Sequence, residues 1–182
     1  MRLHLAILLG LAHLSACRSP VLSDERDALG PELPDVERGE FHRPGQPCLR
    51  CHDSRGGQDP EMVVAGTVFA TPEGRVPFAN AAVTIEDGLG ELVTTSTNCV
   101  GNFYITKEDW PDAVFPLRPS VACVGPGVAG GGTMDSLVYR DGACAGCHTG
   151  SAGEESAGWV YCFEQQPNPP IELDPSCPGR IP

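Results

Sequence analysis

Two short runs with the same pattern constrain this chain more than any other feature. They are Cys48-Leu49-Arg50-Cys51-His52 and Cys144-Ala145-Gly146-Cys147-His148, and each reads C-x-x-C-H. This is the attachment sequence of a c-type haem, in which two thiols add to the vinyl groups of the porphyrin and the following histidine lies under the ring, where it can bind iron. We therefore expect two covalent c-type haems, with His52 and His148 as iron ligands.

A C-x-x-C pair alone is weak evidence, because it is also typical of redox dithiols, zinc sites and disulfides. The histidine after each pair makes the pattern more specific, since the chain has only five histidines among 182 residues. Two alternatives remain, namely a zinc site made by the four motif cysteines, and disulfides throughout. Neither of them explains the two histidines.

The first residues read as an export signal. Arg2 supplies a positive charge, residues 3–14 are mostly apolar, and Leu14-Ser15-Ala16-Cys17 closes the segment. The apolar run is too short to span a bilayer as a stable helix. The four closing residues resemble the lipobox of bacterial lipoproteins, which implies a signal peptide over 1–16 and lipidation of Cys17. The alternative is an ordinary cleaved signal with a cysteine nearby.

The same resemblance implies a location. Arg18 stands where an acidic residue would favour retention at the inner membrane, so we expect an outer-membrane lipoprotein that faces the periplasm or the cell surface. The lipid would be its only membrane contact. Without Arg2 the chain keeps 11 basic residues against 24 acidic ones, a net charge near −13. This charge argues against nucleic acid and suits a basic periplasmic or surface redox protein as partner.

The predicted mature chain has two parts. Residues 17–46 are acidic and rich in proline, with no sustained apolar period, which predicts a flexible tether with at most one helical turn over 23–29. Residues 47–182 are long enough for one domain with a core, and they include a proline-rich C-terminal tail.

Short runs of β-branched and alternating apolar residues fill this domain, and turn residues separate them. The expected strands are 63–70, 81–86, 92–97, 103–105, 117–124, 133–139 and 159–163, and the glycine-rich stretch 125–132 is expected to be a loop. Seven such strands predict an all-β fold, an Ig-like antiparallel sandwich. Six of them lie between the two motifs, and an even number of reversals would bring the motif loops to the same end of the sandwich.

Residues 63–106 resemble a known family. Val64-Ala65-Gly66-Thr67-Val68, the strand 77–85, the run 93–97 and Gly101-Asn102-Phe103-Tyr104-Ile105 follow the pattern of the carboxypeptidase regulatory-like, transthyretin-like domain. The resemblance implies a small β-sandwich that serves as a structural or binding module and has no catalytic residues. Cys99 departs from the pattern, because a small or acidic residue is usual at that turn; this favours a local disulfide with Cys123.

Four cysteines remain besides Cys17 and the motif cysteines. They are Cys99, Cys123, Cys162 and Cys177, an even number in an exported chain, which allows two disulfides and three pairings. We expect Cys99–Cys123 and Cys162–Cys177, because the members of each pair are close in sequence.

Other residues are candidates for the surroundings of a haem. Met62 could supply the second ligand of the first haem's iron, and Met134 could do so for the second haem. His42 is a rival candidate, and a methionine is more often core filling. Three arginines near the motifs could pair with haem propionates or be solvated: Arg50, Arg55 and Arg140. Trp159 and Tyr161 share one face of a predicted strand and could pack in the core or on a haem.

These features predict a lipid-anchored c-type cytochrome-like protein that transfers electrons and is not an enzyme. Helical cytochromes are the usual hosts of the motif, and this chain does not resemble them elsewhere. The alternatives are a structural or binding lipoprotein with disulfides or zinc at its C-x-x-C pairs, and a haem enzyme or sensor if one iron has an open site.

Overall fold

The computed structural model describes residues 20–32, 36, 38–74 and 76–178. The expected signal peptide and Cys17 lie outside the described residues. The chain divides into two compact units, Met1–Pro31 and Glu32–Pro182. In the first unit, Pro20–Asp27 form the helix α2, which is longer than the single turn expected for this stretch. Among the described residues, no helix is both long and apolar enough to cross a membrane.

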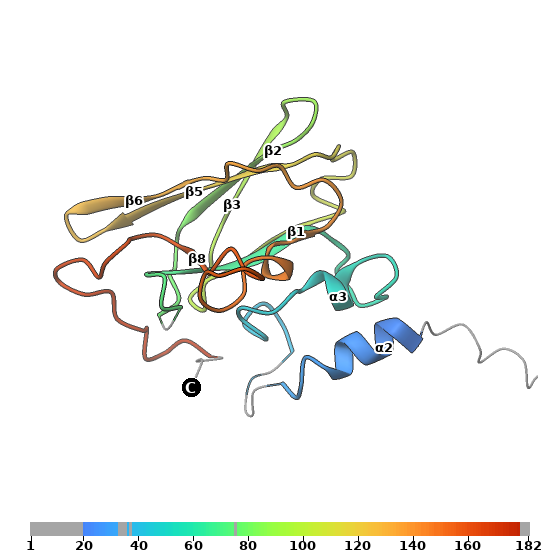
Figure 1. Ribbon diagram of the computed structural model, residues 1–182, viewed down its shortest axis with the longest axis horizontal. Coiled ribbons are helices and arrows are strands. Elements are labelled where there is room, and N and C mark those ends of the chain that lie inside the picture. Colours follow the sequence, from blue (N-terminus) through green and yellow to red (C-terminus); the bar gives the residue numbers. More distant parts are fainter. Residues whose placement is uncertain (1–19, 33–35, 37, 75, 179–182) are drawn as a thin grey trace, which may run out of the picture. The chain divides into compact units, whose positions relative to one another are not determined.

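The second unit is built from strands in two sheets, which confirms the predicted all-β class (Figure 1). One sheet has the order β4-β1-β7, with β8 also paired to β1, and the other has the order β3-β2-β5-β6. The strands are β1 (Met62–Phe69), β2 (Ala82–Glu86), β3 (Leu92–Ser96), β4 (Asn102–Thr106), β5 (Arg118–Gly125), β6 (Val128–Thr133), β7 (Gly142–Ala143) and β8 (Val160–Tyr161).

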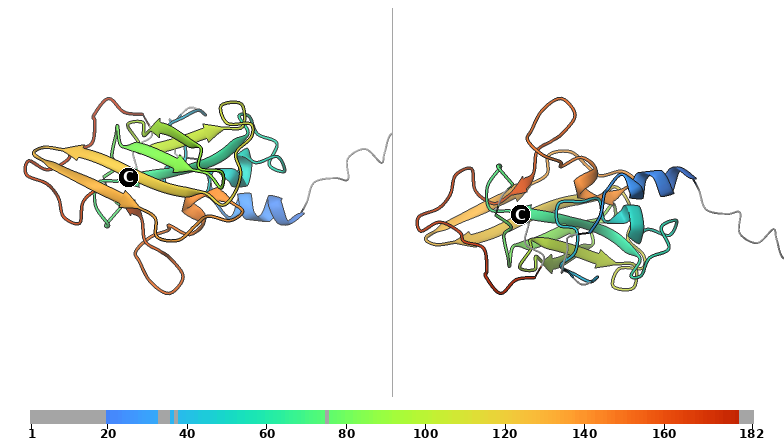
Figure 2. Two further views of the ribbon diagram at one scale, coloured as in Figure 1. Left: turned by 90° about the horizontal axis from the view of Figure 1, so that it is seen from above. Right: turned by 90° about the horizontal axis from the view of Figure 1, so that it is seen from below.

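The two sheets lie one over the other in the views from above and below (Figure 2). Residues of both sheets form one hydrophobic core. Alternate residues of β2 point inward, so that Val83 and Ile85 are fully buried, and Val68 of β1 packs in the same cluster. Burying such branched side chains stabilises the fold by about 1.5–3 kcal/mol each. The alternation seen in the sequence therefore marks the buried face correctly for this strand.

The first sheet is mixed, whereas an antiparallel sandwich was expected. Both short strands β7 and β8 pair with β1 in the parallel direction, with Val64 opposite Gly142 and Val68 opposite Val160. Between β1 and β7 the chain passes through the other sheet. The later strands β7 and β8 can therefore run beside β1 in the same direction. Because β7 ends at Ala143, the second C-x-x-C-H run begins directly beside the central strand of this sheet.

The glycine-rich stretch forms a strand, and the prediction of a loop over 125–132 is wrong. Pro126 and Gly127 make a tight turn with a φ of 69° at the glycine, and β6 then pairs with β5. The glycines allow a close approach of the C-terminal segment: a methyl group at Gly130 would lie 2.2 Å from the carbonyl oxygen of Cys162. The strand expected over 133–139 does not form, apart from an isolated bridge between Leu117 and Val138.

Both disulfides differ from the expected pairing. Cys123 of β5 is bonded to Cys162, which follows β8, so this bond joins the two sheets. The prediction relied on nearness in sequence, and the fold brings distant residues together instead. The chain returns beside β1 as β8, which places Cys162 next to β6. There its carbonyl oxygen accepts a hydrogen bond from the N–H of Gly131 at 2.7 Å.

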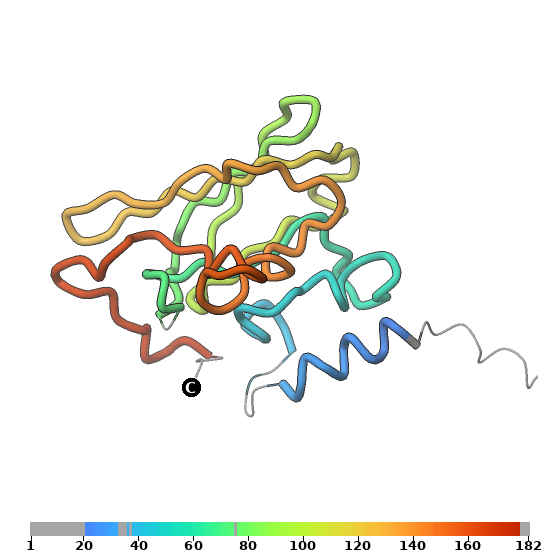
Figure 3. The backbone as a smooth tube through the Cα atoms, in the orientation of Figure 1, coloured from blue at the N-terminus to red at the C-terminus, as the bar shows by residue number. Residues whose placement is uncertain are grey.

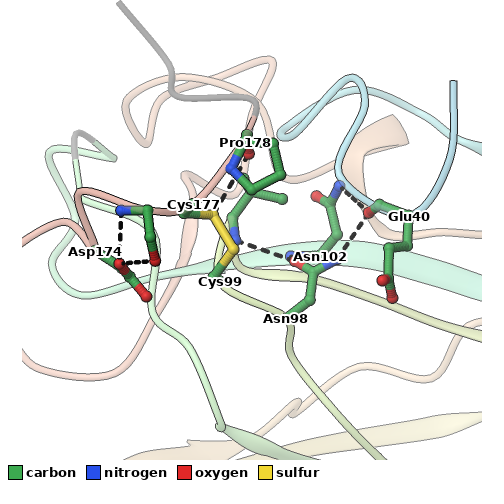
Figure 4. The surroundings of a disulfide bond; sticks show 9 residues. Glu40, Asn98, Cys99, Asn102, Asp174, Cys177 and Pro178 are labelled. Atoms are coloured by element: carbon green, nitrogen blue, oxygen red, sulfur yellow. Dashed lines mark hydrogen bonds between the residues drawn. A yellow bond between two sulfur atoms is a disulfide. The ribbon is translucent and has the colours of Figure 1, made fainter. Parts of the chain in front are cut away.

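The second disulfide joins Cys99 to Cys177 over a separation of 78 residues. Cys99 lies in the turn between β3 and β4, and the segment after β8 follows a long path back to it (Figure 3). Figure 4 shows the bond beside Asn98 and Asn102, whose side-chain amides donate to the carbonyl oxygen of Glu40 at 2.7 and 3.2 Å.

Part of the expected tether packs on the first sheet. The side-chain amide of Asn102 also donates to the carbonyl oxygen of His42, and the N–H of Gly45 donates to the hydroxyl of Thr67 at 2.7 Å. Both Asn102 and Thr67 are buried. We call residues 40–45 the strap, because these bonds fasten the segment to β1 and β4.

Candidate haem-attachment site

The first motif is one turn of helix. Leu49–His52 form α3, and Cys48 precedes it in a helical conformation. The N–H groups of Cys51 and His52 both bond the carbonyl oxygen of Cys48, at 3.1 and 3.0 Å. Residues three and four apart lie on the same side of a helical turn, so this geometry places both thiols and the imidazole on neighbouring positions of one face.

The second motif has the same backbone hydrogen bonds. Cys144–Gly146 form a single 3₁₀ turn that ends at Cys147. The N–H groups of Cys147 and His148 both bond the carbonyl oxygen of Cys144, at 3.1 and 2.9 Å. Two segments that are far apart in sequence therefore present two cysteines and a histidine in the same local arrangement.

Both motif histidines are held by a backbone carbonyl. Nδ1 of His52 lies 3.0 Å from the carbonyl oxygen of Pro60, and Nδ1 of His148 lies 2.8 Å from that of Gly158. A carbonyl oxygen only accepts, so Nδ1 carries the proton and Nε2 keeps its lone pair. This second contact orients a ligand histidine and raises the basicity of its other nitrogen. Each imidazole is thus prepared to bind a metal through Nε2.

The two motifs lie side by side on β1. Leu49 of the first motif packs in one apolar cluster with Ala65 of β1 and Ala143 of β7, and Cys48 and Met62 lie against this cluster. The strand count predicted that the two motifs would share one end of the sandwich; their common contact with β1 does not test this, because β7, which leads into the second motif, runs parallel to β1. A pair of haems attached here would be neighbours.

The four motif cysteines are free thiols, and none takes part in a disulfide. Burial raises the pKa of the Cys48 thiol to about 11 and that of the Cys144 thiol to about 12. The nearby Cys48 also disfavours a charge on Cys144. Cys147, in contrast, is exposed. The thiol of the first cysteine in each motif therefore resists ionisation.

A glycine of β1 makes room for Cys144. A methyl group at Gly66 would lie 2.8 Å from Cβ of Cys144 and 2.9 Å from the ring of Phe103. Such separations are shorter than normal contacts, so the strand and the second motif can pack this closely only because residue 66 has no side chain.

We expect Gly66→Ala to lower the free energy of unfolding by about 1–3 kcal/mol, because overpacking forces the neighbouring atoms apart. Chemical denaturation followed by tryptophan fluorescence would measure the change. Gly146→Ala is the matched control, since nothing lies within 4 Å of a methyl group at that position of the motif. Equal losses for the two variants would contradict this account of the packing.

The structure separates the three candidates for a second iron ligand. Met62 packs against the apolar cluster around Leu49. Met134 follows β6 in the other sheet, where its N–H bonds the carbonyl oxygen of Pro119. The ring of His42, on the strap, lies 5.8 Å from the ring of His52, measured between ring centres.

The three arginines near the motifs line one hollow of about 530 Å³ together with Lys107. Arg55 is engaged with Asp53, since its Nε donates to that carboxylate at 2.7 Å. The hollow is therefore not purely cationic, and Glu61 and Asp141 also line it. It lies beside the first motif, since Leu49 and Arg50 line it.

The two aromatic candidates have different surroundings. Trp159 packs on Phe69, with 4.9 Å between ring centres, and a methyl group at Gly74 would lie 2.2 Å from its indole. Tyr161 instead donates its hydroxyl to Glu164 at 2.7 Å near the surface. Trp159 is thus part of the packing around the end of β1.

In the part of the chain that the structure describes, no group of three or more Asp, Glu, His or Cys side chains is arranged to hold a metal ion by protein ligands alone. The donors present are instead one imidazole and two thiols per motif, the set that a covalent haem requires. No family model, curated protein or solved structure matches the chain.

Sequence reasoning did not find the groups that hold the histidines. Pro60 and Gly158 act through backbone carbonyls, so their residue types give no signal of this role. The sequence named His42 as a rival iron ligand, but it did not indicate that the ring lies 5.8 Å from that of His52.

Proposed function

We propose that this chain is an exported, lipid-anchored c-type cytochrome-like protein that binds two covalent haems and transfers electrons in the cell envelope. The observation that carries the proposal is the repeated arrangement of the two motifs. Each has two free thiols on one helical turn and an imidazole whose Nδ1 donates to a carbonyl. A disulfide or a zinc site made by the cysteines would have no use for two histidines prepared in this way.

The roles of the chain's residues follow from their chemistry. The thiols of Cys48, Cys51, Cys144 and Cys147 would form the thioethers, and Nε2 of His52 and His148 would hold iron from one side. The carbonyls of Pro60 and Gly158 keep each imidazole in one tautomer and orientation. Bound haem iron supplies the chemistry, which is the uptake and release of one electron.

The surrounding fold supports a carrier rather than a catalytic domain. Residues 63–106, which resemble the transthyretin-like family, contribute β1 to β4, divided between the two sheets. We propose that the sandwich is of this type and serves as a scaffold for the motifs. The acidic composition, with a net charge of −12, suits a basic periplasmic or surface redox partner.

The deciding experiment is a haem count on the mature domain. The protein would be produced through the periplasm with the cytochrome c maturation machinery, denatured, and reduced in pyridine. Covalent haem stays with the denatured chain, so we expect a haemochrome spectrum equal to two haems per chain. A chain without haem, whether it holds one zinc ion or none, would overturn the proposal in favour of a cysteine-stapled binding lipoprotein.

A further inference from the structure

The strap holds His42 at a fixed place beside the first motif. The buried amide of Asn102 donates to the carbonyl oxygens of Glu40 and His42 at 3.2 and 3.1 Å. Oδ1 of the same amide accepts from the hydroxyl of Thr67 at 2.7 Å, and this hydroxyl accepts from the N–H of Gly45. The two ends of the strap are thus bonded to β4 and β1, so the position of His42 is set by the sheet.

The ring of His42 is prepared in the same way as the motif histidines. Its Nδ1 contacts the carbonyl oxygen of Gly39, which leaves Nε2 with its lone pair. All three histidines in the described part of the chain therefore have Nδ1 on a backbone carbonyl. His42 is the one among them that does not belong to a C-x-x-C-H motif.

The separation of His42 and His52 suits two ligands of one metal. Their ring centres are 5.8 Å apart, and the rings are inclined by 53°. An imidazole nitrogen binds a metal at about 2 Å, so two such nitrogens on opposite sides of it are about 4 Å apart. The ring centres must be farther apart than the nitrogens, because each ring extends away from the metal.

We propose that His42 binds the iron of the haem attached through Cys48 and Cys51, on the side opposite His52. This inference rests on the proposed function. The first haem then has two histidine ligands. The second motif has no further histidine in the described residues to match it, so its iron has a different coordination.

The test uses the full mature chain with both haems, and compares His42→Ala with Met62→Leu and Met134→Leu. Three quantities would be measured: the haem count in denatured protein, the spin state of the oxidised iron by electron paramagnetic resonance, and carbon monoxide binding by the reduced protein. We expect His42→Ala to convert one iron per chain to a high-spin form that binds carbon monoxide. Added imidazole should restore the low-spin form, and neither methionine variant should affect this iron.

A second variant separates ligation from packing. His42→Met keeps a ligand at the same place, so we expect a low-spin iron with an upward shift in the potential of one haem only. Two haems per chain with unchanged spin state and potential in both His42 variants would overturn the inference and leave the proposed function standing. No covalent haem in the denatured wild-type chain would overturn both.

Discussion

Replacing Cys48 and Cys51 with alanine is expected to lower the covalent haem content from two per chain to one. The two thioethers are the bonds that keep a haem on a denatured chain, so removal of both thiols of a motif releases its haem. The pyridine haemochrome of denatured protein, divided by the protein concentration, measures this content. We expect the remaining haem to show the ligation of the second motif alone.

The matched control is Cys144→Ala with Cys147→Ala, which should also leave one haem per chain. The two single-haem proteins should differ in carbon monoxide binding, because His42 lies beside the first motif alone. A content of two haems that neither pair of substitutions reduces would contradict attachment at the motifs. If the wild-type chain holds one haem, the cofactor belongs to the motif whose cysteine substitutions abolish it.

Removing the disulfide between the sheets should cause a large loss of stability. Cys123 and Cys162 are 39 residues apart in sequence, and the chain-entropy model assigns about 4 kcal/mol to the closure of such a loop. We expect Cys123→Ala with Cys162→Ala to lower the free energy of unfolding by this amount, as measured by urea denaturation with linear extrapolation. Alanine is the better replacement, because both positions are buried and a serine hydroxyl there would need a partner.

Cys99→Ala with Cys177→Ala provides the comparison. These cysteines are 78 residues apart, twice the separation of the other pair, and doubling a loop adds only about 0.6 kcal/mol to its closure entropy. If loop closure dominates, both variants lose similar stability. A loss below about 1 kcal/mol for the inter-sheet pair would contradict a dominant contribution from chain entropy.

The sequence predicts most strands because their signals are local. Ala82–Glu86 alternates buried and accessible residues, and Asn102–Thr106 follows a turn in which Asn98 and a glycine with positive φ take part. The strand Val128–Thr133 was missed because its glycines lack β propensity. One of them, Gly130, is explained by Cys162 and Phe163, which pack on it from more than 30 residues away.

The candidate site, like the strands, could be predicted only where its signals are local in sequence. The spacing of Cys48, Cys51 and His52 is local and predicts two thiols and an imidazole for one haem, although the run was expected to be a loop and forms a helical turn instead. The partners that complete it come from elsewhere in the fold: the carbonyl of Pro60, and the ring of His42 on a segment read as a tether. A backbone carbonyl has no residue-type signature, and a strap fastened by Asn102 cannot be seen without the sheet.

The packing of Cys144 against Gly66 bears on the reactivity of its thiol. A thiol reacts as its thiolate, and a pKa of about 12 leaves almost none of it at neutral pH. In the folded chain, the first cysteine of each motif is thus a poor nucleophile toward a vinyl group and toward the two disulfides. For haem to be attached as proposed, Cys48 and Cys144 would react more readily before folding reduces their exposure. In the folded chain, the same raised pKa slows exchange of the Cys48 and Cys144 thiols with the two disulfides.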